Sequence, residues 1–404
     1  MLINNLVIII ILNVILIIYW YKKHTQLINI GSMFNLLSII YFVIGIYIYN
    51  NIYNGIFDKE LLIISNLAIC AVIAFNLGYF SMYILRRTNI YVKKYTDVSI
   101  KIPDNKLIVL ILIISIGIQL LLVLNIGPLN FIFMDRTERF HYFYQNIGLV
   151  YISNFIYIIY ILYSINFIYY NNKKYKKLFY FTFIYILIWG LITISRNDLL
   201  IIFLTLLYIS EKKGLVSTYK IIMYSISFLL LLLFFKGIMY MFILNNISQE
   251  GINFGEIVNW IRNSITIMHE SNYSYEHFSY FITIKGIFTP LIDKMEPLSN
   301  WFMSEYYPIA YANGNKYGFS GLIEGYMMGG YHYTFIHFFI TGLFVAYFSF
   351  GKTWLHMIIS IMIILIMYKL FRSESYNFYR QIFWYTIYPI LLIKLISFMG
   401  HKKS

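Results

Sequence analysis

The sequence predicts an all-α polytopic membrane protein with about eleven transmembrane helices. Of its 404 residues, 60% are hydrophobic and only 12% are charged, which is about half the charged fraction of a soluble domain. Five segments contain no Asp, Glu, Lys or Arg: 1–21, 61–85, 107–134, 140–172 and 325–351. Because a helix of about 20 residues crosses a hydrocarbon core of about 30 Å, each segment is long enough to span a membrane. The alternating segments of about ten residues that mark a membrane β-barrel are absent from the sequence.

The charges in the connecting loops predict how these helices are oriented. The expected spans are 2–21, 31–50, 61–85, 107–126, 148–170, 178–195, 199–210, 221–244, 331–350, 353–371 and 378–398. Every second loop is basic, and so is the tail 401–404. The positive-inside rule therefore places the N-terminus outside and the C-terminus in the cytoplasm, and an odd number of spans agrees with this. We expect a single integral-membrane domain over residues 1–404.

Two features narrow the class further. No basic residue precedes the first apolar segment and no small-residue cleavage site follows it, so we expect it to be a retained span. The single cysteine, Cys70, lies inside a predicted span, which excludes a disulfide framework and a thiolate metal site.

One predicted outer loop, residues 245–330, is much longer than a connector. It contains 86 residues, including Pro290, Pro297 and Pro308, and it ends in the Gly-rich stretch "NGNKYGFSGLIEGYMMGGYH". Loops of this length in compact proteins are usually functional. We therefore expect this loop to be a functional element of the membrane domain.

The predicted topology places most lysines and most arginines on opposite sides of the membrane. Of the 23 lysines, 16 fall on the cytoplasmic side, and this explains most of the net charge of +14 without nucleic-acid binding. Six of the eight arginines lie at or beyond the outer face: Arg136, Arg139, Arg196, Arg262, Arg372 and Arg380. A guanidinium group binds phosphate oxygens through a planar fork. Five of these, Arg136, Arg139, Arg196, Arg262 and Arg372, are therefore candidate ligands for a phosphorylated substrate.

The stretch "TISRND" places Arg196 and Asp198 between the short predicted spans 178–195 and 199–210. We interpret it as a tight outward turn in which Arg196 is a candidate diphosphate ligand. An arginine that snorkels from a helix end to the interface is the alternative. Asp198 is expected to orient Arg196 or to cap the following span.

Three other cations stand in apolar surroundings. Arg372 in "FRSES" is expected at the outer end of the span 353–371, and Arg262 lies in "WIRNS" of the long loop. Lys236 interrupts the apolar "LLLFFKGIMY". A lysine inside a span is a candidate functional residue, and snorkelling to the outer end is its alternative.

Arg136 and Arg139 in "MDRTERF" are candidate substrate ligands that have acidic neighbours in the sequence. Asp135 and Glu138 lie close to them in sequence and can neutralise them on a solvated helix. Both interpretations stay open for this pair.

No metal, nucleotide or hydrolase motif accompanies these cations. His269 and His277 are eight residues apart, which is not the HExxH spacing, and no P-loop or GxSxG motif occurs. We expect no metal and no cofactor. Since the outer compartment supplies no nucleotide energy, a synthetic reaction there needs an activated substrate, and a lipid diphosphate is the natural one. Several arginines would then stabilise its diphosphate leaving group.

Activation of an acceptor hydroxyl needs a base or an orienting group. The outer-side candidates are Glu324, Asp198, His269 and Glu270. Glu324 lies in "GFSGLIEGYMMGG", where small residues let backbone and substrate approach closely. An interfacial ion pair with a lysine such as Lys316 is the alternative for Glu324.

At these residues the sequence resembles the oligosaccharide repeat-unit polymerases, the Wzy-type O-antigen and capsule polymerases. Ser195 and Arg196 are similar to the pair that opens a short outer turn in that family, and 318–330 with Glu324 is similar to its Gly-rich segment. Arg372 is similar to an arginine near the C-terminus, and "GPLNFIFMDRTERF" resembles the start of an arginine-bearing outer loop. The likeness covers most of the chain in architecture and about 40 residues in motif. The glycine that commonly follows the Ser–Arg pair is Asn here, and this leaves the geometry of the turn open.

The resemblance implies a glycosyltransferase C-like, metal-independent enzyme of the bacterial inner (cytoplasmic) membrane. Such an enzyme transfers an undecaprenyl-diphosphate-linked glycan donor onto the non-reducing end of an incoming acceptor unit. A chain-length regulator and a flippase are the further partners that it implies. The candidate catalytic residues are Arg196, Arg372 and Glu324. The candidate substrate-binding residues are Arg136, Arg139, Arg262, Lys236, Asp198 and His269.

Other interpretations stay open. A lipid-linked oligosaccharide flippase or other transporter usually shows paired repeats and ionisable groups near the bilayer midplane, whereas charges here gather at one face. An O-antigen ligase, which catalyses closely related chemistry, is another alternative. A polyprenyl-phosphate monosaccharide transferase is less favoured, because the acids of the short first outer loop are only Asp58 and Glu60.

Overall fold

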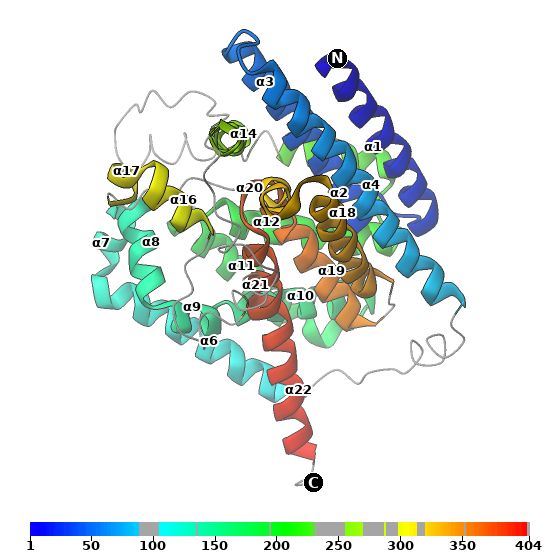
Figure 1. The fold of residues 1–404 in the computed structure, drawn as a ribbon. Coiled ribbons are helices and arrows are strands. Elements are labelled where there is room, and N and C mark those ends of the chain that lie inside the picture. The colour runs from blue at the N-terminus through cyan, green and yellow to red at the C-terminus, as the bar shows by residue number, and fades with distance from the viewer. Residues whose placement is uncertain are drawn as a thin grey trace. The chain divides into compact units, whose positions relative to one another are not determined.

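The computed structural model describes residues 1–88, 105–134, 136–193, 195–228, 231, 255–269, 287, 298–312, 320–350 and 353–401. Throughout these residues the regular secondary structure is helical (Figure 1). Seven of the described helical segments are long and apolar enough to cross a membrane, which confirms a polytopic α-helical membrane protein. They are Leu2–His24, Ile30–Ile52, Asp58–Arg86, Lys106–Ile126, Ile147–Tyr169, Lys173–Ile192 and Trp354–Arg372.

These seven segments correspond to seven of the predicted spans. Of the other four, 199–210 falls in α12 (Arg196–Lys212), and 331–350 is part of a longer, broken helix. The predicted span 378–398 lies within consecutive helices, and most of 221–244 lies outside the described residues. The total of eleven spans therefore stays a prediction.

The chain forms two compact units, and each combines two separate stretches of sequence. Unit 1 comprises residues 1–98 and 253–382, and unit 2 comprises residues 99–252 and 383–404. Most of the long predicted loop therefore belongs to the same unit as the first spans.

The helices of unit 1 include pieces of the long loop as well as membrane spans. In chain order they are α1 (Leu2–His24), α2 (Ile30–Ser38), η1 (Ile39–Ile44), α3 (Gly45–Ile52), α4 (Asp58–Thr88), α14 (Gly255–His269), α16 (Leu298–Tyr306), α17 (Pro308–Ala312), α18 (Gly321–Ser349), α19 (Trp354–Ile366), α20 (Lys369–Arg372) and α21 (Ser375–Ile382). Thr25 adopts a left-handed conformation that ends α1. Asn29 then caps α2, because its side chain accepts from the amide of Ser32 at 2.9 Å.

The most extensive helix packing among the described parts of unit 1 joins α4 to α18. Two glycines make this packing close. A Cβ atom on Gly78 would lie 2.1 Å from the carbonyl oxygen of Phe339, and one on Gly342 would lie 2.1 Å from that of Phe75. Glycine lets the two helix backbones approach to a distance that any side chain would prevent, as at many membrane helix contacts.

A buried polar ladder joins α1, α2 and α4. Trp20 Nε1 donates to Asn76 Oδ1 at 2.8 Å, and the amides of Asn76 and Asn35 exchange hydrogen bonds of 3.0 and 3.1 Å. The three side chains are between 0 and 5% exposed. Polar side chains inside apolar helices need such partners, because an unpaired amide in hydrocarbon costs free energy. The ladder therefore fixes the register of these three helices.

The helices of unit 2 surround one buried helix. In chain order they are α6 (Asn105–Ile126), α7 (Pro128–Phe133), α8 (Arg136–Gln145), α9 (Ile147–Ser153), α10 (Phe155–Ser164), η2 (Ile165–Tyr169), η3 (Lys173–Tyr175), α11 (Lys176–Ile192), α12 (Arg196–Lys212), η5 (Phe383–Ile387) and α22 (Tyr388–His401). In α10, nine of the ten residues are buried. It packs against α6, α11, α12 and α22, so it forms the centre of this unit.

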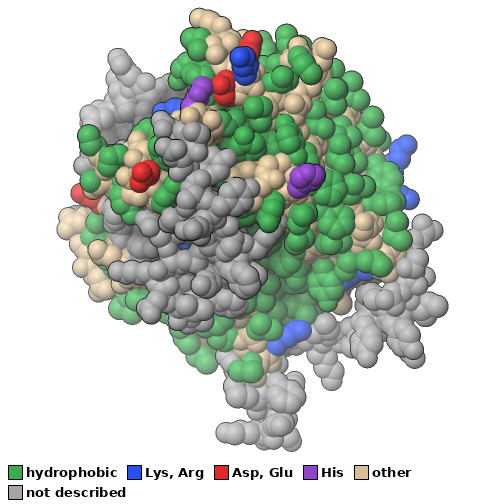
Figure 2. Space-filling view, in the orientation of Figure 1, with side chains coloured by type: hydrophobic (Ala, Val, Ile, Leu, Met, Phe, Trp, Pro, Cys, Tyr) green, Lys and Arg blue, Asp and Glu red, His purple; other side chains and the backbone are tan. Residues whose placement is uncertain are grey.

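Exposed apolar side chains are abundant on the spans. Figure 2 shows hydrophobic side chains over much of one face, with charged groups scattered among them. On α1, for example, Ile3, Ile11 and Ile15 are each more than half exposed. Such surface is unfavourable in water and favourable against lipid chains, so it supports the membrane assignment.

Candidate functional site

The Gly-rich segment of the long predicted loop forms one arm of a helical hairpin. Within α18, Gly329 (φ 156°, ψ 33°) and Gly330 (φ 67°, ψ −142°) leave the helical conformation. A Cβ atom on Gly325 would lie 2.8 Å from Thr334 Cα, and one on Gly321 would lie 3.5 Å from His337 Nε2. These pairings are antiparallel, so the short arm 321–328 folds back against the long arm that follows.

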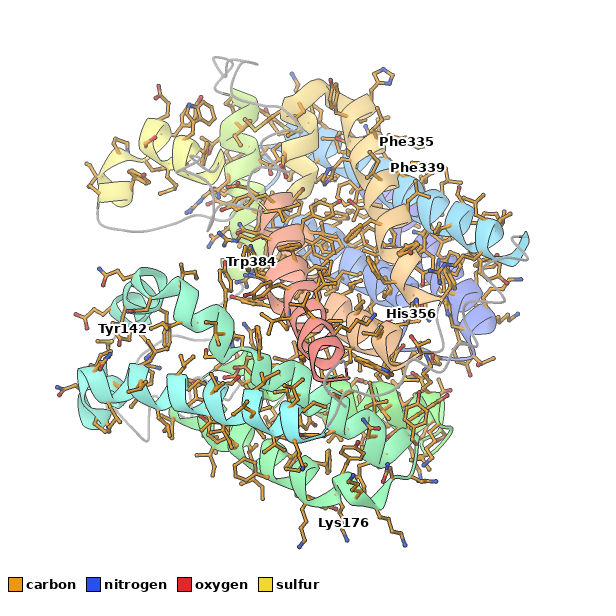
Figure 3. All side chains as sticks on the ribbon, turned by 90° about the horizontal axis from the view of Figure 1, so that it is seen from below. Tyr142, Lys176, Phe335, Phe339, His356 and Trp384 are labelled. Atoms are coloured by element: carbon orange, nitrogen blue, oxygen red, sulfur yellow. The ribbon has the colours of Figure 1, made fainter. Side chains whose placement is uncertain are left out.

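Figure 3 shows this long arm, with Phe335 and Phe339 labelled on it. Their rings stack on one another with centroids 6.1 Å apart. The short arm begins with a capped turn, because Ser320 Oγ accepts from the amide of Ile323 at 3.3 Å. Glu324 lies in this first turn and is only 4% exposed. The sequence placed Glu324 before a span, and the structure places it inside a buried helical arm.

A buried polar node ties this arm to the start of α21. Glu324 Oε2 accepts a hydrogen bond from the backbone amide of Ser375 at 2.8 Å, and Ser375 Oγ lies 2.7 Å from His337 Nε2. Ser375 is the first residue of α21, where backbone amides have no intrahelical partner. A carboxylate at a helix N-terminus also interacts favourably with the helix dipole. Glu324 therefore caps α21 from another helix.

Arg372 is brought to the same turn. It ends α20, three residues before Ser375, and its guanidinium carbon lies 5.0 Å from the centroid of the Tyr368 ring. The Nζ atom of Lys369 lies 5.1 Å from the same centroid. Two cations therefore gather at the turn that Glu324 holds. We call Glu324, His337, Arg372 and Ser375 the hairpin cluster.

Helix α14 of the long loop packs beside the hairpin cluster. It contacts α20 and α3, and Ile267 of α14 shares a buried hydrophobic core with Ile323 and Met327 of the short arm. Arg262 is partly buried on α14. The structure thus places three of the sequence-predicted residues, Glu324, Arg372 and Arg262, on adjoining elements of unit 1.

His269 lies apart from this group, at the end of α14. Its side chain is 56% exposed, and its Nε2 atom lies 3.2 Å from Glu60 Oε1. Two of its neighbours in sequence, the candidate base Glu270 and His277, lie outside the described residues. Among the residues that the structure describes, no group of three His, Cys, Asp or Glu is placed to hold a metal ion.

In unit 2, the "TISRND" stretch forms the expected turn between α11 and α12. Ser195 is the N-cap residue of α12, and its Oγ accepts from the amide of Asp198 at 3.4 Å. The cap is therefore Ser195 and not Asp198. The Asp198 carboxylate, 6% exposed, accepts from Tyr157 OH at 2.6 Å and from Thr193 Oγ1 at 3.5 Å. Arg196 is the first residue of α12 and is partly exposed.

Burial dominates the acidity of Asp198, which lies between two predicted spans. It raises the pKa of this carboxyl to about 6, while hydrogen bonds from Tyr157, Ser195 and Thr193 act in the opposite direction.

Arg139 anchors the same turn through backbone carbonyls. Its Nη1 donates to the oxygen of Thr193 at 2.7 Å, and its Nη2 lies 3.1 Å from the oxygens of Phe131 and Met134. Thr193 is three residues before Arg196. The guanidinium of Arg139, a candidate substrate ligand, therefore makes contacts that hold the turn, and its binding of substrate stays a prediction. We call Tyr157, Arg139, Ser195, Arg196 and Asp198 the turn cluster.

Two other predicted ligands are described only in part or not at all. Arg136 begins α8, but its side chain lies outside the described part of the chain, and Lys236 lies outside it entirely. The neutralisation of Arg136 and Arg139 by Asp135 is likewise outside the described residues. These expectations stay predictions.

Sequence reasoning missed His337 and Ser375. A histidine in the apolar run "FIHFF" was a usable signal, because ionisable residues inside spans are expensive and often functional. Ser375 gave no such signal, since its role depends on a contact made by its backbone amide across 51 residues of sequence.

The fold and the two clusters define a multi-pass α-helical membrane protein with buried polar groups at helix ends. Comparison of the chain with protein-family models, curated proteins and solved structures finds no match.

Proposed function

We propose that this protein is a membrane glycosyltransferase of the repeat-unit polymerase type. It would join undecaprenyl-diphosphate-linked oligosaccharide units into O-antigen or capsular polysaccharide at the outer face of the bacterial cytoplasmic membrane. The sequence resemblance motivates the proposal. The observation that carries it furthest is the hydrogen bond that the Ser375 amide donates to Glu324, which joins the Gly-rich arm to the turn bearing Arg372.

In this proposal the arginines act on the leaving group. The acceptor hydroxyl attacks the anomeric carbon of the donor and its proton passes to water at the outer face. The bond to the diphosphate breaks, and the diphosphate leaves with added negative charge. Arg372 of the hairpin cluster is the proposed ligand of that charge, and Arg196 of the turn cluster is a separate candidate that is tested by itself. Guanidinium groups suit this task because they bind two phosphate oxygens at once.

Glu324 is proposed to position Arg372 and not to transfer the proton itself. Its carboxylate is almost fully buried and already accepts a hydrogen bond from the Ser375 amide. A general base must reach the proton that it removes. Burial and commitment to a helix end therefore favour a positioning role.

A transporter of lipid-linked oligosaccharides is the second candidate, and one observation favours it. Helix α18 is interrupted at Gly329 and Gly330, and transporters commonly use discontinuous helices at their binding sites. An O-antigen ligase shares the donor chemistry of the polymerase and is separated from it only by the product.

The experiment that tests the proposal is a glycan gel of the source bacterium, comparing wild type, a gene deletion, and complementation with Arg372→Lys or Arg196→Lys. Arg380→Lys is the matched control, since Arg380 also stacks on a tyrosine, Tyr376, at 5.3 Å. Lysine keeps the charge but loses the planar fork. Membrane expression is checked by immunoblot.

A polymerase predicts that the deletion leaves one repeat unit on the final acceptor, and that both test variants behave like the deletion while the control makes a ladder. Lipid-linked units that accumulate on the cytoplasmic side would instead identify a flippase. Long chains that stay on the lipid carrier would identify a ligase. A normal ladder from Arg372→Lys and Arg196→Lys would remove the arginines from the mechanism.

A further inference from the structure

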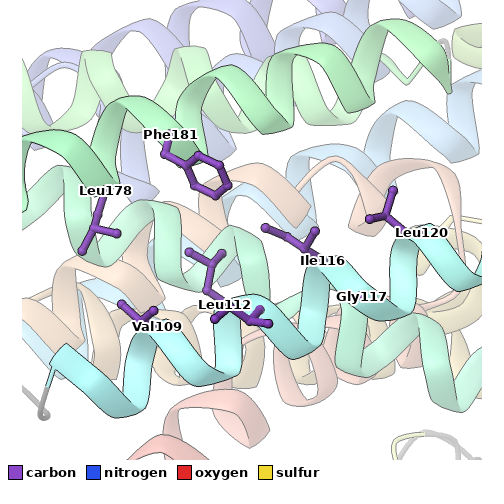
Figure 4. Close-up of a pocket in the computed structure, with 8 residues that line it drawn as sticks. Val109, Leu112, Ile116, Gly117, Leu120, Leu178 and Phe181 are labelled. Carbon is purple, nitrogen blue, oxygen red and sulfur yellow. The ribbon is translucent and has the colours of Figure 1, made fainter.

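A groove of about 510 Å³ runs between α6 and α11 in unit 2 (Figure 4). Six residues of α6 from Val109 to Leu120 and two of α11, Leu178 and Phe181, line it, and all of them are apolar. Gly117 widens it, because a Cβ atom at that position would meet no atom within 4 Å. Both helices belong to candidate membrane spans. The groove therefore faces the hydrocarbon region of a bilayer.

The two helices that form the groove are held together beside it. Helix α10 packs against both α6 and α11. At the far end, Tyr185 OH donates to Gln119 Oε1 at 2.7 Å, and Gln119 is only 2% exposed. A buried hydrogen bond of this kind between two spans resists separation, because both partners would be left unpaired in an apolar medium. The width of the groove is therefore fixed at that end.

The length of the groove matches one leaflet. The eleven-residue step from Val109 to Leu120 corresponds to about 16 Å of helix. Half of a hydrocarbon core of about 30 Å is about 15 Å. The groove is therefore long enough for a single lipid chain from one leaflet.

The open end is basic. In Figure 4, Val109 and Leu178 lie at one end and Leu120 at the other, so α6 and α11 begin on the same side. Lys106 precedes Val109 by three residues, and Lys177 precedes Phe181 by four, which places both lysines on the groove-lining faces of their helices. Both are exposed, and the neighbouring lysines of this end are also exposed: Lys173, Lys174 and Lys176.

We propose that this groove binds one acyl chain of an anionic phospholipid, with the headgroup phosphate at Lys106 and Lys177. The apolar residues contact the acyl chain, and the two lysines bind the negatively charged headgroup phosphate. A zwitterionic lipid with the same chains fits the wall equally well but carries no net charge. The preference for an anionic headgroup is therefore the signature of the site. This binding does not depend on the proposed enzymatic function.

The experiment is native mass spectrometry of the purified full-length protein, titrated with phosphatidylglycerol or with phosphatidylcholine of identical chains. Gly117→Leu fills the groove, and Gly148→Leu is its matched control, because a Cβ at Gly148 also meets no atom within 4 Å. Lys106→Gln and Lys177→Gln test the headgroup, with Lys220→Gln as the control for an exposed lysine elsewhere in unit 2.

We expect the wild type to retain one phosphatidylglycerol molecule in preference to phosphatidylcholine. Gly117→Leu abolishes this retention and Gly148→Leu keeps it. Each lysine variant lowers the preference about fivefold, the effect of about 1 kcal/mol per basic residue at an anionic surface.

Three results would overturn the proposal. The first is equal retention of the two lipids by the wild type. The second is unchanged retention by Gly117→Leu. The third is displacement of phosphatidylglycerol by an equimolar polyprenyl phosphate, which would make an isoprenoid chain the occupant.

Discussion

The backbone amide of Ser375 donates to the carboxylate of Glu324 at 2.8 Å, so a residue of the Gly-rich arm caps a helix that starts 51 positions later in the chain. The bond is buried at both ends. A buried amide that loses its acceptor pays the cost of desolvation without compensation. The stability of unit 1 is therefore linked to the position of the short arm.

Replacement of Glu324 tests this link. We expect Glu324→Gln to keep an acceptor oxygen and lower stability only slightly, whereas Glu324→Ala leaves the Ser375 amide unpaired and costs about 1–3 kcal/mol. Thermal unfolding in detergent measures the difference. Equal melting temperatures for the two variants would show that the hydrogen bond contributes nothing.

The contact between α4 and α18 makes a second prediction. Gly342→Ala places a methyl group 2.1 Å from the Phe75 carbonyl oxygen, so the helices must separate. Overpacking of this kind costs about 1–3 kcal/mol or more. Gly117→Ala is the control, because its methyl group meets no atom within 4 Å. Circular dichroism during heating should show a lower melting temperature for Gly342→Ala alone.

The acidity of Asp198 gives a prediction about pH. Burial raises its pKa to about 6 in the folded protein, compared with about 4 in the unfolded chain. Between pH 4 and pH 6 the folded state binds more protons than the unfolded state. The stability that the folded protein gains from protonated Asp198 is therefore complete below about pH 4 and is lost as the pH rises through 6. The loss is on the order of 3 kcal/mol.

Asp198→Asn removes that titration. Relative to the wild type, we expect the variant to gain stability steadily from pH 4 to pH 7, as measured by melting temperatures in detergent. Tyr157→Phe removes a hydrogen bond to the carboxylate and should raise the pKa of Asp198 further. The loss of stability in this variant should therefore occur at a higher pH than in the wild type. Parallel pH profiles for the wild type and Asp198→Asn would contradict a titrating Asp198.

Arg139 supplies the last prediction. Lysine at this position keeps the charge, but one ammonium cannot reproduce the planar fork that contacts carbonyls on two segments. We expect Arg139→Lys to loosen residues 128–146 from the "TISRND" turn and to increase cleavage there in limited proteolysis. Arg380→Lys serves as the control. Cleavage equal to that of the wild type would mean that the carbonyl contacts do not hold the segment.

The membrane class was predictable because it depends on composition and on run length. Seven predicted spans coincide with long apolar helices, and the turn at Arg196 falls where two charged residues interrupt apolar sequence. These signals are local. A charge-free run of 20 residues has few stable conformations in a bilayer other than a spanning helix.

The hairpin was not predictable in the same way. Glycines at 329 and 330 indicate an interruption, but only the pairing of Gly325 with Thr334 shows that the chain folds back. Likewise, the bond from Arg139 to the Thr193 carbonyl depends on where α8 meets the end of α11. Such contacts join residues that are far apart in sequence, and charge patterns do not specify them.

The ladder of Trp20, Asn76 and Asn35 also has a consequence for biogenesis. The Trp20 indole and the amide oxygens of Asn35 and Asn76 are paired across the helices when α1, α2 and α4 are together, whereas the two amide nitrogens also donate to carbonyls of their own helices. An unpaired polar group that faces lipid is costly. The first spans to emerge during synthesis thus cannot settle independently into the bilayer. We therefore expect α1, α2 and α4 to associate early, so that the N-terminal quarter of the chain offers a formed surface against which the later α18 hairpin packs.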